Sequence, residues 1–188
     1  AVDGSDSLAG NSAFVIDGAA PTIAVSSDVS SLKAGETATL SFTLSESSTN
    51  FEANDLTVSG GTLSNFSGSG SSYSATFTPT ADSTTDGAIS IASSKFSDAA
   101  GNTNADGSDA NNSVSLTVDT VRPTIAVSSD VSSLRADETA TLTFTLSDVS
   151  TDFIQSDITV SGGTLSNFSG SGTSYSATFT PTADSTTD

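Results

Sequence analysis

Apolar and polar residues alternate along much of the chain, and this two-residue period predicts β-strands. The clearest example is the segment 38–45, in which Ala, Leu and Phe alternate with Thr and Ser. By the same pattern, strands are predicted over 22–26, 55–59, 63–66, 73–77, 89–96 and 114–118. No segment has the 3.6-residue period of an amphipathic helix, so the sequence predicts an all-β fold.

Short turns separate the predicted strands. Gly60-Gly61 and Gly68-Ser-Gly70 supply the backbone freedom that tight turns need, and 28–36 is a turn-rich connection. About seven short strands in roughly 100 residues are typical of an immunoglobulin-like β-sandwich with Greek-key connections. Because the chain has no Cys and no Trp, the core is expected to rest on aromatic and aliphatic side chains, namely Leu40, Phe42, Phe66, Phe77 and Phe96.

A long internal repeat divides the chain. The segment 21–32 recurs at 123–134, an offset of about 102 residues, and roughly four-fifths of positions are identical between 20–86 and 122–188. Such a long and close repeat indicates tandem duplication of a whole domain. We therefore predict a complete Ig-like repeat over 18–119 and a partial second repeat over 120–188.

The beginning of the chain also repeats a later part. Asp3-Gly-Ser-Asp6 matches 106–109, and Ala13-Phe-Val-Ile-Asp17 matches the strand predicted before Asp119. Residues 1–17 are therefore expected to be the C-terminal tail of a preceding repeat, and the chain to be a segment of a longer array.

The charge of the chain excludes several kinds of partner. Its 22 acidic residues against 4 basic ones give a formal net charge of −18. Nucleic acid is excluded as a partner because binding its phosphates needs clustered Lys and Arg, and anionic membrane surfaces are disfavoured for the same reason. No apolar run is long enough to insert into a membrane. Self-repulsion of this size favours the binding of divalent cations.

The loop 98–112 concentrates the residues that such a cation would use. It holds three Asp, four Asn and two Gly in fifteen residues. Oxygen ligands and sharp turns suit Ca²⁺, whereas zinc or copper is improbable in a chain with neither His nor Cys. The alternative interpretation is an Asx-rich turn whose side chains cap their own backbone.

Tracing the strand directions brings the acidic loops to two poles of the sandwich. The candidate metal ligands at the N-terminal pole are Asp17, Glu46, Asp55, Asp98, Asn102, Asn104 and Asp106. The candidates at the C-terminal pole are Asp28, Asp82, Asp86 and Asp119, and those of the second copy are Asp148 and Asp157. If successive copies stack pole to pole, Ca²⁺ would convert repulsion at the joint into attraction. For Asp28, Asp82 and Asp86, solvated turn acids remain an equal alternative.

The motif Asp98-Ala-Ala-Gly-Asn102, together with Glu46 and the linker 118–123, resembles the Ig-like extender repeats of giant calcium-dependent RTX adhesins of bacteria. That family includes biofilm adhesins and an ice-binding adhesin. The resemblance implies Ca²⁺ at pole loops and inter-repeat joints, with Asp98, Asn102, Glu46 and Asp119 as ligands. It also implies an extracellular location on the cell surface, with neighbouring repeats as partners and the distal ligand bound by other domains.

Two other classes of function fit the sequence less well than this structural role. An enzyme such as a glycosidase would need paired carboxylates beside a sugar platform, and the chain is not expected to be an enzyme. A glycan-binding module would need an exposed aromatic ring, but Tyr73 and Tyr175 fall in phase with the core. Glycan binding and self-association remain the alternatives to an extender role.

Overall fold

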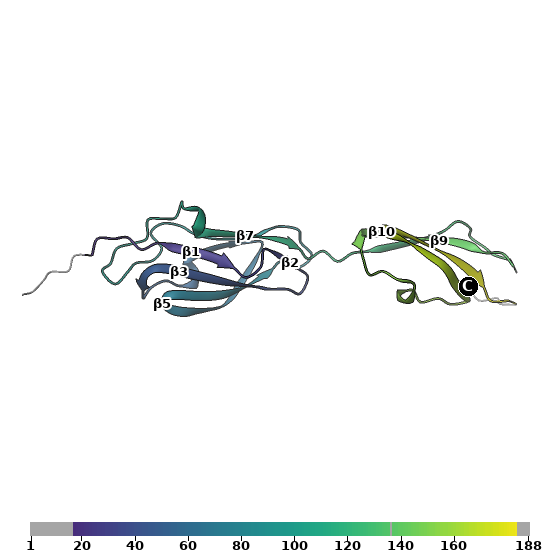
Figure 1. Ribbon diagram of the computed structural model, residues 1–188, viewed down its shortest axis with the longest axis horizontal. Helices are drawn as coiled ribbons and strands as arrows, with labels where there is room; N and C mark the ends of the chain where they lie inside the picture. The colour runs from purple at the N-terminus through teal and green to yellow at the C-terminus, as the bar shows by residue number, and fades with distance from the viewer. Residues whose placement is uncertain (1–16, 136, 184–188) are drawn as a thin grey trace, which may run out of the picture. The chain divides into compact units, whose positions relative to one another are not determined.

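The computed structural model describes residues 17–135 and 137–183. They form two compact units that meet in sequence between Val121 and Arg122 (Figure 1). The predicted tail of a preceding repeat, residues 1–17, lies outside the described residues except for Asp17.

The first unit is a sandwich of two sheets. One sheet has the order β1-β3-β5 and the other β2-β7-β6-β4. The strands of the first sheet are β1 (Ile23–Ser27), β3 (Ala38–Ser48) and β5 (Gly61–Pro79). Those of the second sheet are β2 (Ser31–Lys33), β7 (Ser113–Asp119), β6 (Gly87–Ile91) and β4 (Leu56–Ser59), and two short 3-10 helices, η1 (Ala53–Asp55) and η2 (Ala110–Asn112), lie in the connections. The predicted all-β sandwich is confirmed.

Three local features differ from the expected strands. The connection 28–36 contains β2, which pairs parallel with β7 and has too few residues to show an alternating pattern. The predicted strands over 63–66 and 73–77 belong to one extended run, β5, whose two halves are joined by a bond from Asn65 Nδ2 to Thr76 Oγ1 of 3.3 Å. Phe96 is buried beyond the end of β6 rather than in that strand.

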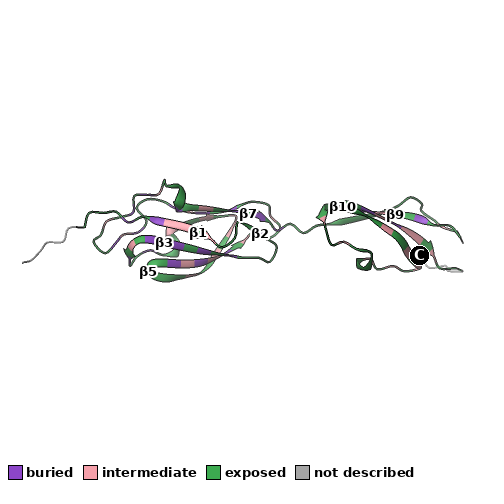
Figure 2. Cartoon of the chain, viewed as in Figure 1, coloured by how far each residue is buried: buried purple, intermediate pink, exposed green. Residues whose placement is uncertain are grey.

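The inward positions of both sheets form one core. Along β3 buried and exposed residues alternate strictly from Ala38 to Ser45, as the sequence pattern predicts, and the alternation is visible along the strand in Figure 2. Leu40 and Phe42 of the first sheet and Leu116 of the second are fully buried. An aromatic residue that the strand pattern did not single out, Phe51, lies at the centre, with edge-on ring contacts to four aromatic neighbours, Phe42, Phe66, Tyr73 and Phe96.

The second unit repeats the first sheet of the first unit. Its strands are β8 (Ile125–Ser129), β9 (Ala140–Ser150) and β10 (Gly163–Pro181), with a 3-10 helix η3 (Gln155–Asp157). The sheet order β10-β9-β8 and the pairing of Ile125 with Leu146 reproduce the first copy, in which Ile23 pairs with Leu44. Among the described residues of this unit there is no counterpart of β6 or β7, so only one of the two sheets is present.

Within the described ranges, no helix has the length and apolar character required to cross a membrane.

Close packing across the sandwich predicts the effect of a methyl group at Gly87. A Cβ atom at this position would lie 2.6 Å from Cζ of the buried Phe77 ring. We expect Gly87→Ala to lower the free energy of unfolding by roughly 1–3 kcal/mol, because an overpacked core must shift. Gly18→Ala is the control, since nothing lies within 4 Å of its added Cβ. Urea unfolding monitored by circular dichroism measures both, and equal stability of the two variants would contradict the packing described.

Candidate metal centre

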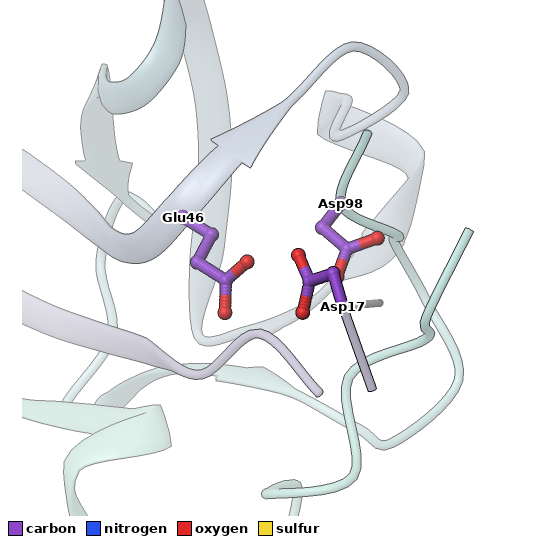
Figure 3. A group of neighbouring side chains, drawn as sticks. All are labelled: Asp17, Glu46 and Asp98. Atoms are coloured by element: carbon purple, nitrogen blue, oxygen red, sulfur yellow. The ribbon is translucent and has the colours of Figure 1, made fainter. Parts of the chain in front are cut away.

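Three carboxylates meet at one end of the first unit. One oxygen atom from each of Asp17, Glu46 and Asp98 lies within 4.8 Å of the other two. Figure 3 shows the side chains pointing toward one another from three separate segments. Asp17 precedes β1, Glu46 lies near the end of β3, and Asp98 follows β6. The centre therefore joins the entering chain to segments attached to both sheets.

The strand period explains why Glu46 points into this centre. Even-numbered residues of β3 face the interior, and the series continues past Leu44 to the half-buried Glu46 and the buried Ser48. At this end of the sandwich the inward direction leads to the pole loops rather than to the apolar core. The β3–β5 pairing shifts register between Thr43 and Ser48, and a bulge of this kind redirects side chains at a sheet end.

A tight turn holds Asp98 in place. Ser48 and Asp98 form an isolated antiparallel bridge, so the end of β3 lies beside this residue. The Asn102 backbone N–H donates to Asp98 Oδ1 at 2.9 Å, and the Asp98 N–H donates to the Asn102 carbonyl at 3.1 Å. Gly101 has a φ of 91°, which glycine adopts without strain. The Asp-Ala-Ala-Gly-Asn motif is thus a closed turn that presents one carboxylate.

Asn102 also connects this turn to the entering chain. Its Nδ2 donates to Asp98 Oδ2 at 2.8 Å and to the Asp17 carbonyl oxygen at 3.2 Å. One amide group therefore touches two of the three acidic residues, and it fixes the position of Asp17 relative to Asp98.

The three acids differ in their electrostatic environment. Burial raises the pKa of Glu46 above its ordinary value, and the charges of Asp17 and Asp98 and a hydrogen bond with Asp17 raise it further. The pKa of Asp98 is lowered, chiefly by the hydrogen bond from the Asn102 side chain. Asp98 is therefore held as a carboxylate, while Glu46 retains a proton more readily. A bound divalent cation would relieve the same repulsion without a proton.

The donor set fits a hard cation. The converging side chains offer carboxylate oxygens alone, which are the ligands Ca²⁺ prefers. Carboxylates from three segments can satisfy part of its shell of six to eight oxygens, and carbonyl groups and water complete such shells in proteins.

Two predicted ligands, Asn104 and Asp106, are buried, and Asp106 is not part of the group of three carboxylates. Asn104 Oδ1 accepts from the backbone N–H groups of Lys95 and Phe96 at 2.7 and 3.2 Å, and its Nδ2 donates to the Ala92 carbonyl at 3.0 Å. Asp106 Oδ2 accepts from the Ile23 N–H at 2.7 Å. These side chains bind the loop to β1 and to the segment after β6.

Asp55 and Asp157 hold 3-10 helices at equivalent places in the two copies. Asp55 Oδ2 accepts from the Glu52 N–H at 2.9 Å, and Asp157 Oδ2 accepts from the Ile154 N–H at 3.0 Å. The structure therefore places the Asp55 carboxylate in a capping contact and outside the group formed by Asp17, Glu46 and Asp98.

The remaining predicted ligands lie in turns or on the surface. Asp28 Oδ1 accepts from the Thr39 N–H at 2.8 Å, and Asp86 and Asp119 accept from the N–H groups of Val118 and Val121, both at 3.3 Å. In the second unit, Asp148 Oδ2 accepts from the Ser147 hydroxyl at 2.7 Å. Asp82 is exposed, with a φ of 49°. Within the parts of the chain that the structure describes, none of these acids joins a group of three.

Asn50, which no sequence motif marks, supports the centre. Its Oδ1 accepts from the Ser48 hydroxyl and from the Ser97 N–H, both at 2.9 Å, and so joins the end of β3 to the residue before Asp98. The only sequence signal was its position in a polar loop, which does not reveal a partner 47 residues away.

The two tyrosine side chains belong to the core, as predicted. Tyr73 and Tyr175 are 7% and 6% exposed, and their hydroxyls donate to the carbonyls of Ser48 and Ser150 at 2.9 and 3.0 Å. Neither ring is available as a surface platform for a sugar.

Comparison with protein families identifies the fold. A family described as bacterial Ig-like domain matches residues 17–117 and 119–188. The chain belongs to this family of bacterial Ig-like domains. The predicted Ig-like fold class is thus confirmed, whereas a place among RTX adhesins stays a prediction.

Solved structures and curated proteins were also compared. The chain is similar to FdeC, described as a broadly conserved Escherichia coli adhesin, with 21% identity and a TM-score of 0.44. The similarity covers 85% of this chain and 55% of the FdeC chain, so the chain spans about half of that structure. No curated protein matches.

The buried contacts of Asn104 predict a structural role without metal. We expect Asn104→Ala to lower the free energy of unfolding by roughly 1–3 kcal/mol, because the backbone N–H groups of Lys95 and of the buried Phe96 lose their acceptor. The control is Asn111→Ala in the same loop, since Asn111 is exposed. Both should be measured by denaturant unfolding in chelator, where a loss confined to Ca²⁺-containing buffer would indicate a metal ligand instead.

The raised pKa of Glu46 predicts that its charge destabilises the metal-free fold. A carboxyl whose pKa is raised by folding favours the folded state at low pH and loses this contribution as pH rises through the folded pKa. We therefore expect Glu46→Gln to raise the Tm at neutral pH in chelator, and the gain to vanish at pH values below the Glu46 pKa. Asp82→Asn removes the same charge from an exposed turn and should change the Tm little, and an unchanged Tm in Glu46→Gln would contradict the repulsion described.

Proposed function

We propose that this chain is a structural extender segment of a bacterial cell-surface adhesin. Its Ig-like copies are linked in tandem. Ca²⁺ at the loop poles and at the joints between repeats rigidifies the array. The distal ligand is bound by other domains. The observation that supports this role most directly is the group formed by Asp17, Glu46 and Asp98, because Asp17 belongs to the segment that enters the unit.

A cation bound by these carboxylates would act as a mechanical link. In its absence, the Asp17 region is held by the bond from Asn102 to the Asp17 carbonyl, while the carboxylates repel one another. With the cation bound, the repulsion becomes attraction, and the entering chain is tied to β3 and to the loop after β6. The orientation of that entering chain relative to the sandwich then loses freedom, which is what an extender requires.

The repeat extends the argument to the array. In sequence, Asp119, which precedes the second copy, and Asp148 within it take the positions of Asp17 and Glu46. Each copy adds about 40 Å of length, as strands of ordinary size with polar loops would give. A glycan-binding role has less support, because both tyrosine rings are buried in the core.

An extracellular setting suits the proposed metal. Extracellular modules bind Ca²⁺ with dissociation constants of roughly 10⁻⁴ to 10⁻³ M, so such a site fills only where calcium is abundant. Folding that is completed by Ca²⁺ would then follow export to the cell surface.

Calcium should stabilise the chain through these carboxylates. We expect 5 mM Ca²⁺ to raise the Tm by roughly 5–15 °C relative to chelator, because the ion binds the folded state alone. Asp98→Asn and Glu46→Gln should each remove most of this gain. Asp109→Asn is the control for charge, because Asp109 is exposed in the same loop and makes no capping bond with its side chain.

An identical Ca²⁺ response in Asp98→Asn, Glu46→Gln and Asp109→Asn would show that the ion binds elsewhere. Rigidity needs a separate measurement, namely small-angle scattering from a chain of several complete copies with and without Ca²⁺. A maximum dimension that Ca²⁺ leaves unchanged would contradict the extender role even if the metal binds.

A further inference from the structure

The residue that follows β7 is buried, although it belongs to the segment by which the chain leaves the first unit. Thr120 is 3% exposed, whereas Asp119 and Val121 on either side of it are exposed. Thr120 continues the inward series of β7, which includes the buried Leu116 and Val118. Because successive residues of a strand point to opposite faces, the series that buries two apolar side chains brings a hydroxyl to the end of the sandwich.

Thr120 binds the loop after β5 through both its backbone and its side chain. Its N–H donates to the Ser83 carbonyl at 2.9 Å, and the Ser83 N–H donates to Thr120 Oγ1 at 2.9 Å. The Thr120 hydroxyl donates to the Thr80 carbonyl at 2.7 Å, and the Ser83 carbonyl is a second acceptor at 3.1 Å. A threonine hydroxyl has one proton to donate and can also accept, so these contacts satisfy the buried oxygen.

The loop that receives these bonds is itself held to the sandwich. The N–H of Thr80, which directly follows β5, donates to the Gly60 carbonyl at 2.9 Å, between β4 and β5. Farther along the loop, Asp86 Oδ1 accepts from the Val118 N–H at 3.3 Å. A Cβ atom added to Gly60 would overlap the Asp86 carbonyl oxygen, so the pole is closely packed here. Thr120 therefore joins the end of β7 in one sheet to the end of β5 in the other.

These contacts lie at the end of the unit opposite the three carboxylates. The pairing of β3 with β5 places Phe77, near the end of β5, opposite Ala38, the first residue of β3. Glu46 lies near the other end of β3. The carboxylates therefore act on the segment that enters the unit, and Thr120 acts on the segment that leaves it.

We propose that Thr120 is a metal-independent lock that fixes the direction in which the chain leaves the first unit. The lock consists of the contacts of Thr120 with Thr80 and Ser83. It goes beyond the proposed calcium role and does not rest on it, because all three residues are uncharged and their bonds need neither a cation nor a particular protonation state. In an extender, the lock restrains the connection to the next copy whether or not metal is bound.

The burial of Thr120 explains why its bonds can restrain the backbone. Ordering a residue costs conformational entropy, which a connecting segment ordinarily retains. Hydrogen bonds offset this cost best where water does not compete for the same groups, as at a residue that is 3% exposed. The next residue, Val121, is exposed, and its N–H donates only locally, to Asp119 Oδ1 at 3.3 Å. The freedom of the connection therefore begins after Thr120 rather than at the end of β7.

Backbone ¹⁵N relaxation of the 188-residue chain in chelator tests whether the lock is closed without metal. We expect an order parameter of about 0.85 at Thr120, as in rigid backbone. A value below about 0.6 at Thr120 would overturn the proposal without the need for any variant.

Hydrogen exchange of the same chain in chelator tests whether the Thr120 hydroxyl is responsible. Thr120→Val removes the hydroxyl and keeps the branched shape, so the Ser83 N–H loses its acceptor. We expect the Ser83 and Thr120 amides to exchange at least about tenfold faster in this variant. Thr120→Ser keeps the hydroxyl and should retain slow exchange. Thr117→Val is the matched control, because Thr117 lies in β7 but its side chain is exposed.

The amide of Phe42 in the core separates a local effect from a general loss of stability. Thr120→Val should accelerate exchange at Ser83 much more than at Phe42, because the lock restrains the connection rather than the whole sandwich. Equal acceleration at both amides would overturn the proposal, since Thr120 would then support only the fold. Exchange in Thr120→Ser as fast as in Thr120→Val would also overturn it, and so would protection of Ser83 that appears only when Ca²⁺ is added.

Discussion

The contact between the inward face of β3 and the inward faces of β6 and β7 is what the first unit depends on. It buries Leu40, Phe42, Ile89 and Leu116 completely and leaves every charged residue of these strands outside the core. Among the described residues of the second unit, the sheet of β8, β9 and β10 has the same strand pairing as its counterpart in the first unit.

The same geometry places the acidic centre. An inward-facing series along β3 passes from Leu44 to Glu46, so the direction that buries leucine inside the sandwich brings a carboxylate to its pole. There it meets Asp17 and Asp98, although each comes from a distant part of the chain. A strongly acidic chain can carry such a group at a pole because water and ions reach it there, whereas the core could not accept it.

Glu46 and Asp98 have opposite electrostatic environments, although both belong to the same group of carboxylates. The Asn102 amide stabilises the ionised form of Asp98 and lowers its pKa, while burial and two like charges raise the pKa of Glu46, which therefore retains a proton more readily than Asp98. A proton on Glu46 and a divalent cation would each relieve the repulsion between the carboxylates, so the two would compete for binding. The two copies also differ at this point, since the second has the shorter, exposed Asp148 in place of Glu46, so the proposed metal sites of the two copies need not be equivalent.

Local pattern predicted the all-β fold, the repeat, most strand positions and the core phenylalanines, because alternation reports which side of a strand faces an apolar interior. It also predicted that Asp17, Glu46, Asp98 and Asn102 share a pole. It could not separate these four from Asn104, Asp106 and Asp55, whose chemistry is the same but whose oxygens are occupied by backbone N–H groups. That distinction, like the parallel β2–β7 pair and the central Phe51, depends on contacts between residues far apart in sequence, and only the folded arrangement of the two sheets decides which of them form.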